Sequence, residues 1–186
     1  MPSLIYLTNV SLDGYIEDAS GRFDWSVPDE ELHQFFNDLT RPIGTFLYGR
    51  RLYDSMAVWE TDPGFAADNA VTAEFAEVWQ AADKVVYSTT LDAPRTTRTR
   101  LERTFDPAAV RDLKAAATRD LTVGGANLAG QALRADLVDE VQLVVHPVVV
   151  GGGKPALPDG VRADLTLLEE RRFAGGHVYL RYGVRR

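Results

Sequence analysis

The stretch LTVGGANLAGQALR, residues 121–134, contains a short apolar run, a glycine pair and an amphipathic run in direct succession. Residues 121–123 are apolar or β-branched, which favours a buried strand. Gly124 and Gly125 follow as a turn signal, and the next apolar side chains recur at helical spacing. These helical positions are Leu128, Ala132 and Leu133. The order of strand, tight turn and helix is the unit from which sheets of parallel strands are built.

The residues before this stretch repeat the alternation of strand and helix. Apolar, β-branched runs predict strands over Ser3–Val10, Thr45–Tyr48, Lys84–Tyr87 and Arg100–Phe105. Helical spacing and first-turn residues predict helices over Asp29–Leu39, Leu52–Val58, Ala73–Ala82 and from Pro107 to about Thr118. Thr72 and Asp106 are the expected N-caps of the last two helices. We expect a long loop after Val10 and a mobile loop over Glu60–Val71.

The last third of the chain contains strand patterns alone. The expected strands are Glu140–Val150, Asp164–Arg172 and Val178–Val184, the last two joined by a turn at Gly175 and Gly176. No repeat or linker divides the sequence. We therefore predict one α/β domain over residues 1–186, with a mixed, mostly parallel sheet flanked by helices and antiparallel C-terminal strands.

Composition excludes several classes of protein. The 186 residues include 20 Lys and Arg against 27 Asp and Glu, a formal charge of −7, which argues against nucleic-acid binding by bulk positive charge. No apolar run approaches the roughly 20 residues that span a bilayer, so no membrane association is expected. Cysteine is absent, which removes disulfides, thiolate metal sites and cysteine nucleophiles. The N-terminus resembles no signal peptide, so the cytoplasm is the expected location.

Two predicted strand-to-helix junctions could bind an anion. Tyr48-Gly49-Arg50-Arg51 and Val123-Gly124-Gly125-Ala126-Asn127 each place glycine before a helix, where free backbone N–H groups can meet a diphosphate. The simpler interpretation of the glycine pair is a tight turn. The two arginines oppose the helix dipole and favour an anionic partner, although a solvated pair or salt bridges to the surplus carboxylates would also satisfy them.

A third cluster combines an aromatic side chain with carboxylates. Trp25 precedes Pro28, Asp29 and Glu30, so that a carboxylate against the indole could act as a proton donor or anchor a nitrogen heterocycle. An acidic first turn beside a core tryptophan is the simpler interpretation. The histidines, at positions 33, 146 and 177, lack metal-ligand spacing, and no metal site is expected. The sequence also lacks the G-x-G-x-x-G, G-x-S-x-G and P-loop patterns.

Taken in order, these motifs resemble the dihydrofolate reductase superfamily, in the branch similar to the C-terminal reductase domain of the riboflavin-pathway deaminase-reductase. Residues 11–16 resemble the start of the family's mobile loop over the nicotinamide, and residues 25–30 its W-x-x-P-x-[DE] motif. Residues 49–51 resemble its G-R-[KRH] motif, and residues 124–128 its double-glycine turn. The run from His146-Pro147 to Lys154-Pro155 is similar to the branch's P-x-x-x-G-G segment.

The resemblance implies a dihydrofolate-reductase-like fold, NADPH as cofactor and a set of site residues. The implied catalytic group contains Glu30, less strongly Asp29, and Asp13 on the covering loop. The implied substrate-binding residues are Trp25, Tyr6 and Asn9, the last two at a strand end expected to face the same cleft. The implied cofactor-binding residues are Gly49, Arg50, Arg51, Ser88, Thr89, Gly124, Gly125, Ala126, Asn127 and Leu128, with the serine and threonine near the adenosine 2′-phosphate.

One departure from the family bears on the substrate. Folate reductases carry an L-P-x-R element before the strand that here is Lys84–Tyr87, whereas this chain has EVWQAAD over residues 77–83 and no arginine there. Folate is therefore not the expected substrate, and the uracil derivative of the riboflavin enzyme is one option. We expect an NADPH-dependent reductase of a small heterocyclic or carbonyl compound, with a non-catalytic NADPH-binding regulator as the alternative. The family resemblance also implies a homodimer.

Overall fold

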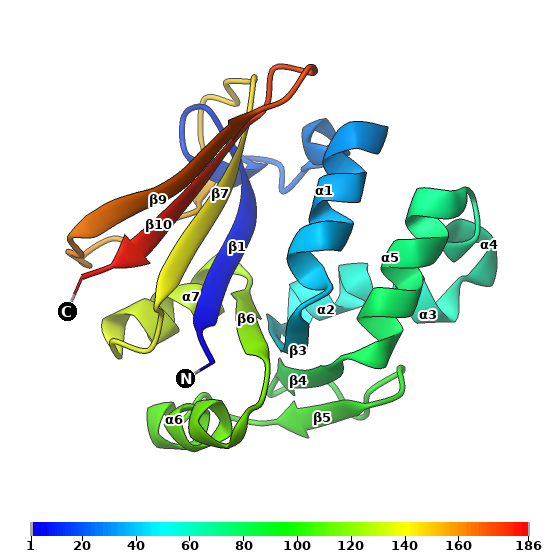
Figure 1. Ribbon diagram of the computed structural model, residues 1–186. Helices are drawn as coiled ribbons and strands as arrows, with labels where there is room; N and C mark the ends of the chain where they lie inside the picture. Colours follow the sequence, from blue (N-terminus) through cyan, green and yellow to red (C-terminus); the bar gives the residue numbers. More distant parts are fainter. Residues whose placement is uncertain (1, 186) are drawn as a thin grey trace.

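The computed structural model describes residues 2–185 and contains a twisted eight-stranded sheet with helices on both faces (Figure 1). In spatial order its strands are β5 (Thr99–Glu102), β4 (Asp83–Tyr87), β3 (Ile43–Gly49), β6 (Asp120–Gly124), β1 (Leu4–Ser11), β7 (Glu140–His146), β10 (Val178–Val184) and β9 (Leu165–Arg172). The six strands from β5 to β7 are parallel. Strand β10 is antiparallel to β7, and β9 is antiparallel to β10. The predicted α/β class is confirmed.

Helices cover the two faces of this sheet. On one face lie α1 (Glu30–Thr40), α2 (Arg50–Met56) and α5 (Ala70–Ala81), and on the other α6 (Pro107–Ala116) and α7 (Ala126–Arg134) (Figure 1). Successive side chains of β1 point to opposite faces of the sheet, so the strand packs against both layers of helices. Leu4 and Tyr6 lie in the cluster with α6 and α7, and Ile5 lies in the cluster with α2 and α5. Each such large apolar side chain contributes about 1.5 to 3 kcal/mol on burial.

Local signals explain where the best-defined helices begin. Asp29 caps α1 by accepting a hydrogen bond from the backbone N–H of Leu32, and Asp106 caps α6 in the same way through Ala108. In α1 the apolar face places Leu32 and Phe35 against β7 and β10. Among residues 2–185, none of the helices has the length and apolar content needed to cross a bilayer.

Several predicted boundaries are wrong. The expected loop over Glu60–Val71 instead holds most of two short helices, α3 (Val58–Thr61) and α4 (Pro63–Ala66), and Asn69, not Thr72, caps α5. Thr72 is the third residue of that helix and completes a capping box with Asn69. The predicted strand over Glu140–Val150 ends at His146.

The long loop after β1 also contains structure that the sequence pattern did not indicate. It forms the short strand β2 (Tyr15–Asp18) and the 3₁₀ turn η1 (Asp24–Ser26), and β2 pairs with β8 (Gly153–Pro155) from the glycine-rich segment after β7. This second, two-stranded sheet ties together two loops that leave the carboxyl ends of neighbouring strands.

Candidate functional site

Two helix starts face each other at the carboxyl edge of the parallel strands. Tyr48 of β3 pairs with Gly124 of β6, so the residues that follow, Gly49 and Gly125, lie side by side as the N-caps of α2 and α7. A Cβ built on Gly125 would lie 3.9 Å from the backbone nitrogen of Gly49 and meet nothing closer, and one on Gly49 would meet nothing within 4 Å. Neither helix has a side-chain cap, so free N–H groups border an open space.

Gly124 and Gly125 are each required to be glycine, for different structural reasons. Gly125 has φ +88°, a backbone conformation that side chains other than glycine rarely adopt. Gly124 has ordinary backbone angles, but a Cβ there would collide with the Leu52 side chain of α2. Gly124 therefore permits close packing of α2 on β6, and Gly125 makes the turn that directs the start of α7 toward Gly49. Tight-turn geometry and an anion-binding edge are compatible here.

The predicted phosphate-binding arginines are both paired with carboxylates. Arg50 contacts Asp54 at 3.3 Å and donates a 2.7 Å hydrogen bond to the hydroxyl of Thr90, whereas Arg51 extends in another direction to Glu17 of β2 at 3.2 Å. The salt-bridge alternative therefore describes both side chains in this structure. Because such exposed pairs are worth about 0 to 1 kcal/mol, a phosphate could take the place of either carboxylate.

The predicted strand-end hydroxyls occupy different environments. Ser88 is buried, and its hydroxyl accepts backbone hydrogen bonds from Thr90 and Leu91 in a tight turn, while Thr89 is exposed. The structure adds Arg103, which the sequence analysis missed: its guanidinium donates to the carbonyl oxygens of Ser88 and Leu91. The parallel pairing of β4 with β5 brings this cation beside the turn, and no local motif marks it.

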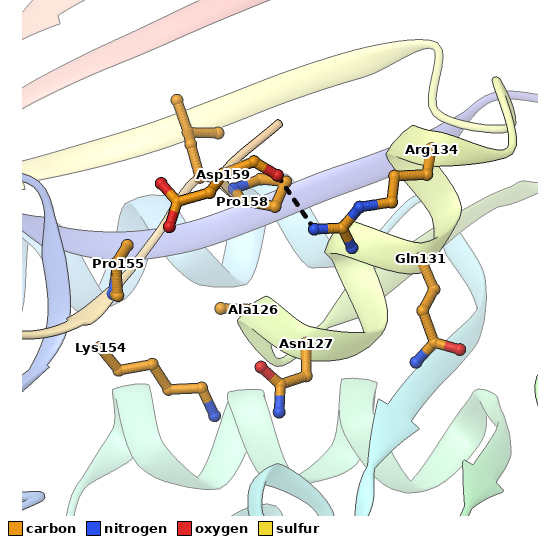
Figure 2. A pocket seen from close by; sticks show the side chains of 9 residues that line it. Ala126, Asn127, Gln131, Arg134, Lys154, Pro155, Pro158 and Asp159 are labelled. Carbon is orange, nitrogen blue, oxygen red and sulfur yellow. Dashed lines mark hydrogen bonds between the residues drawn. The ribbon is translucent and has the colours of Figure 1, made fainter. Parts of the chain in front are cut away.

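A hollow of about 440 Å³ runs along α7 from the start of that helix (Figure 2). Ala126 and Asn127 from the predicted turn line it, together with Gln131, Arg134, Lys154, Pro155 and residues 157–159. Leu128, by contrast, is a core residue and does not reach the hollow. Figure 2 shows Lys154 and Asn127 extending from two different segments toward the same side, and Arg134 donating to the backbone carbonyl of Asp159.

Asp13 holds two loops together. Its carboxylate accepts hydrogen bonds from the hydroxyl of Ser11 and from the backbone N–H groups of Val150 and Gly151. These bonds, the Ser11 bond first, hold the pKa of Asp13 below its usual range, so the side chain stays ionised at neutral pH. That state suits a fixed acceptor better than a proton donor. The predicted catalytic role of Asp13 remains a prediction, and the contacts in the structure are those of a clamp.

The two polar residues predicted on β1 point to opposite faces of the sheet. Tyr6 is fully buried, and its hydroxyl donates to the carbonyl oxygen of Ala156, so it lies under the segment that borders the α7 hollow rather than in an open cleft. Asn9 faces the α1 side, where its Oδ1 lies 2.9 Å from Nε2 of His146. The expectation that both side chains face one cleft is wrong, because successive residues of a strand alternate between faces.

A row of touching rings continues from His146 toward the start of α1. Trp25 meets His146 edge to face at a centroid distance of 5.5 Å, and His146 meets His177 in the same manner at 4.6 Å. Asp29 adjoins the far end: a Cβ built on Gly175 would lie 2.6 Å from Oδ2 of Asp29 and 3.0 Å from the His177 ring. Asp29 and the ring of His177 therefore both border Gly175, at the end of the ring row away from Trp25.

Glu30 lies elsewhere. It lines a shallow surface hollow with Phe35, Val71 and Arg171, among other residues, between α1, the start of α5 and β9. The motif W-x-x-P-x-[DE] selected Glu30 as the carboxylate beside Trp25, but the structure places Asp29 at the end of the ring row and turns Glu30 away. The cause is the register of α1, because consecutive helical residues point about 100° apart and Asp29 is fixed as the N-cap.

Burial determines the charge state of His146. His146 is 1% exposed, and this burial, together with the neighbouring His177, lowers the pKa of His146 to about 4. At neutral pH it is an uncharged imidazole, which donates through one ring nitrogen and accepts through the other. Within residues 2–185, no group of three or more His, Cys, Asp or Glu side chains is arranged to hold a metal ion.

Known proteins match this chain over nearly its full length. A family model described as RibD C-terminal domain matches residues 2–179. The uncharacterized protein YyaP of Bacillus subtilis (strain 168) is 31% identical over 175 residues, which cover 93% of this chain and 90% of the relative.

Solved structures share the fold at low sequence identity. A candidate riboflavin biosynthesis protein from Shewanella sp. PV-4 superposes with a TM-score of 0.78 at 21% identity, over 99% of both chains. A pyrimidine reductase-like protein from Corynebacterium diphtheriae gives 0.68 at 14%, over 100% of this chain and 92% of its own. The diaminohydroxyphosphoribosylaminopyrimidine deaminase/5-amino-6-(5-phosphoribosylamino)uracil reductase of Thermotoga maritima gives 0.65 at 15%, and 99% of this chain spans 57% of that one.

Proposed function

The chain belongs to the RibD C-terminal domain family, and from this premise we propose that it is an NADPH-dependent reductase that transfers hydride to a small heterocyclic or carbonyl substrate. The observation that carries the proposal is the pair of helix starts at Gly49 and Gly125. Two sets of free backbone N–H groups border one open space, and the glycines leave that space clear of side chains. This arrangement suits the diphosphate of a dinucleotide.

The residues around that space fit the rest of the cofactor. Arg50 with Thr90, and Arg103 beside Ser88, would hold the adenosine 2′-phosphate through charge-assisted hydrogen bonds. Ala126 and Asn127 would lie along the diphosphate at the start of α7. NADPH, when bound, supplies the hydride, and the protein has to position the acceptor and manage one proton.

On the other side of the carboxyl edge, Asp29 and the ring row would form the substrate side. The Asp29 carboxylate is fixed by its bond to the Leu32 N–H, beside His177. This carboxylate would accept a hydrogen bond from a ring N–H of the substrate. After hydride transfer it would pass a proton from solvent to the reduced substrate. Trp25 would close one side and exclude water from the reacting carbon.

The proposed substrate class is supported by the name of one relative and by what this chain lacks. The Thermotoga maritima relative is named for the reduction of 5-amino-6-(5-phosphoribosylamino)uracil, and we propose a related pyrimidine or another small carbonyl-bearing heterocycle here. Folate is not proposed, because no arginine stands where folate reductases hold the glutamate tail. A screen of pteridines, pyrimidines and quinones for substrate-dependent consumption of NADPH tests this proposal.

A non-catalytic NADPH-binding regulator is the second candidate, because the proposed cofactor residues form a better-defined arrangement than the proposed substrate residues. Binding of NADPH without consumption in the presence of any compound of the screen would favour the regulator. Absence of NADPH binding would contradict both functions.

We also propose that the protein is a homodimer. The edge strand β9 leaves the side chains of Leu167 and Leu168 about half exposed, next to a row of charges of both signs formed by Glu169, Glu170, Arg171 and Arg172. Leu167 and Leu168 project to opposite faces of the sheet, so a second copy packed on one face would cover one of them. The molar mass in solution, with Leu168→Lys as the disrupting variant, tests the assembly.

A further inference from the structure

The two-stranded sheet of β2 and β8 reaches the first turn of both α2 and α7. On the β2 side, the carboxylate of Glu17 lies 3.2 Å from the guanidinium of Arg51, the second residue of α2. On the β8 side, Lys154 lines the hollow that also borders Ala126 and Asn127, the first two residues of α7. The small sheet therefore adjoins the two helix starts that we propose to bind the cofactor diphosphate.

The backbone around Lys154 fixes where its side chain begins. Lys154 pairs directly with Glu17 across the small sheet, so the two side chains project from the same face. Gly153 has φ +139°, and a Cβ there would collide with the backbone of β2, so glycine permits this close approach of the strands. The Asp13 carboxylate also binds the N–H of Gly151, which holds the segment before β8 against the first loop.

The ammonium of Lys154 has no anionic partner. The residue is half-buried, and within residues 2–185 its Nζ makes neither a hydrogen bond nor a salt bridge. The carboxylate opposite it, on Glu17, is engaged by Arg51, and Asp159, the carboxylate among the residues that line the hollow, does not pair with it. Figure 2 shows Lys154 extending to the same side as Asn127. A half-buried cation without an acceptor is stabilised when an anion binds beside it.

We propose that Lys154 is a further cofactor-binding residue, whose ammonium donates a hydrogen bond to the diphosphate of NADPH beside the start of α7. This inference rests on the proposed function and adds to its cofactor site a residue from the glycine-rich segment after β7. Lys154 adjoins the α7 start, whereas Arg50 lies with Thr90 at the turn after β4, where we place the 2′-phosphate. The diphosphate is common to NADPH and NADH. Loss of the Lys154 charge should therefore weaken both cofactors by the same factor.

Binding of the two cofactors to Lys154→Met tests the inference without a substrate. Methionine retains the unbranched apolar part of the side chain and removes the charge. Dissociation constants for NADPH and NADH are measured by calorimetry on the full chain. We expect both to rise about tenfold, the equivalent of one charge-assisted hydrogen bond, with their ratio unchanged. Lys154→Arg should retain most of the affinity, and the loss in Lys154→Met should shrink at high salt, because salt screens the attraction.

Two other cations of this region provide controls. Arg134 borders the same hollow but is the last residue of α7, about 12 Å along the helix axis from its start, and it donates to the carbonyl of Asp159. Arg134→Met should leave both dissociation constants unchanged. Arg50→Ala should give a different signature, with NADPH weakened more than NADH. Circular dichroism on each sample shows that the variants are folded, so a change in affinity is assigned to the site.

The outcomes distinguish this inference from the function on which it rests. If the wild-type protein binds neither cofactor, the proposed function and the role of Lys154 are both wrong. If it binds NADPH and Lys154→Met binds both cofactors equally well, the role of Lys154 alone is overturned. A loss confined to NADPH would place Lys154 at the 2′-phosphate instead of the diphosphate, and an equal loss in Arg134→Met would show a general effect of positive charge. Either result would also overturn the inference.

Discussion

A side chain built on Gly125 would lie 3.9 Å from the backbone nitrogen of Gly49, so the turn after β6 directs the start of α7 against the start of α2. Both helices start at the carboxyl edge of neighbouring parallel strands, and each N-terminus carries a partial positive charge. An anion between the two helix starts would be stabilised by both charges. The proposed position of the NADPH diphosphate follows from this one relationship.

Gly49→Val should weaken cofactor binding strongly in a folded protein. Gly49 has φ −71° and ψ 159°, which valine adopts without strain, and its Cβ would enter open space. We expect NADPH affinity to fall about 100-fold or more, the loss of two charge-assisted hydrogen bonds of about 1.5 kcal/mol each. Fluorescence titration of NADPH with circular dichroism on the same sample measures both effects. Gly125→Val is a weaker test, because its φ of +88° adds strain. Unchanged affinity of Gly49→Val would remove the diphosphate from this edge.

The preference for NADPH over NADH should depend on Arg50 more than on Arg51. Arg50 lies with Thr90 at the turn after β4, whereas Arg51 extends to Glu17 on β2. Loss of one charge-assisted bond to the 2′-phosphate is worth about 1.5 to 3 kcal/mol, so Arg50→Ala should reduce the preference on the order of tenfold or more. Dissociation constants for both cofactors check this, with Arg51→Ala as the matched control. If the wild type, Arg50→Ala and Arg51→Ala all show the same preference for NADPH over NADH, there is no 2′-phosphate site at Arg50.

Asp29→Asn should impair turnover far more than Glu30→Gln. Asp29 lies beside His177 at the end of the ring row, and Glu30 lines the hollow near Arg171. Asparagine caps helices as well as aspartate does, so α1 should remain intact while the site loses a charge and a proton acceptor. Loss of such a group typically costs about 100-fold to 10,000-fold in rate. The measurement is kcat at saturating NADPH once a substrate is known. A large loss in Glu30→Gln with normal turnover in Asp29→Asn would show that the carboxylate chosen by the sequence motif, and not the N-cap of α1, is the acid.

Acidification should destabilise the fold through His146. Its pKa is about 4 when folded against 6.5 for an ordinary histidine, so below about pH 6.5 the unfolded chain binds a proton that the folded protein does not. Stability from this group is present above pH 6.5, falls as the pH is lowered and is fully lost near pH 4. The contribution is on the order of 1 to 3 kcal/mol. Urea unfolding of the wild type and His146→Phe at several pH values checks this, since the variant should lose stability less steeply. Parallel curves would contradict a buried, neutral His146.

The strands and longer helices could be predicted from sequence because their signals are local. Apolar runs such as Leu121–Val123 and caps such as Asp106 depend on a few neighbouring residues. The glycine pair and the Arg50 junction could be placed together, because carboxyl ends of parallel strands meet at one edge. Boundaries were less predictable where two residues could cap a helix, as Asn69 and Thr72 could for α5.

The substrate side could not be predicted in the same way, because it depends on contacts between distant segments. His146 and His177 meet only because β7 pairs with β10 in one register, with Val145 opposite Val178. Separately in the sequence, neither histidine has a motif. The choice between Asp29 and Glu30 depended on a single residue of helix register, which the N-cap decides. Arg103 likewise reaches Ser88 through the pairing of β4 with β5.

The most direct measurement of the central claim is the consumption of NADPH by the purified protein in the presence of a pyrimidine acceptor, compared with Gly49→Val. The account predicts that the wild-type protein binds NADPH with one site per chain and oxidises one NADPH for each molecule of acceptor reduced. At the NADPH concentration that half-saturates the wild type, Gly49→Val should do neither to a measurable extent. Failure of the wild-type protein to bind NADPH, or equal rates of oxidation in the wild-type protein and Gly49→Val, would contradict it.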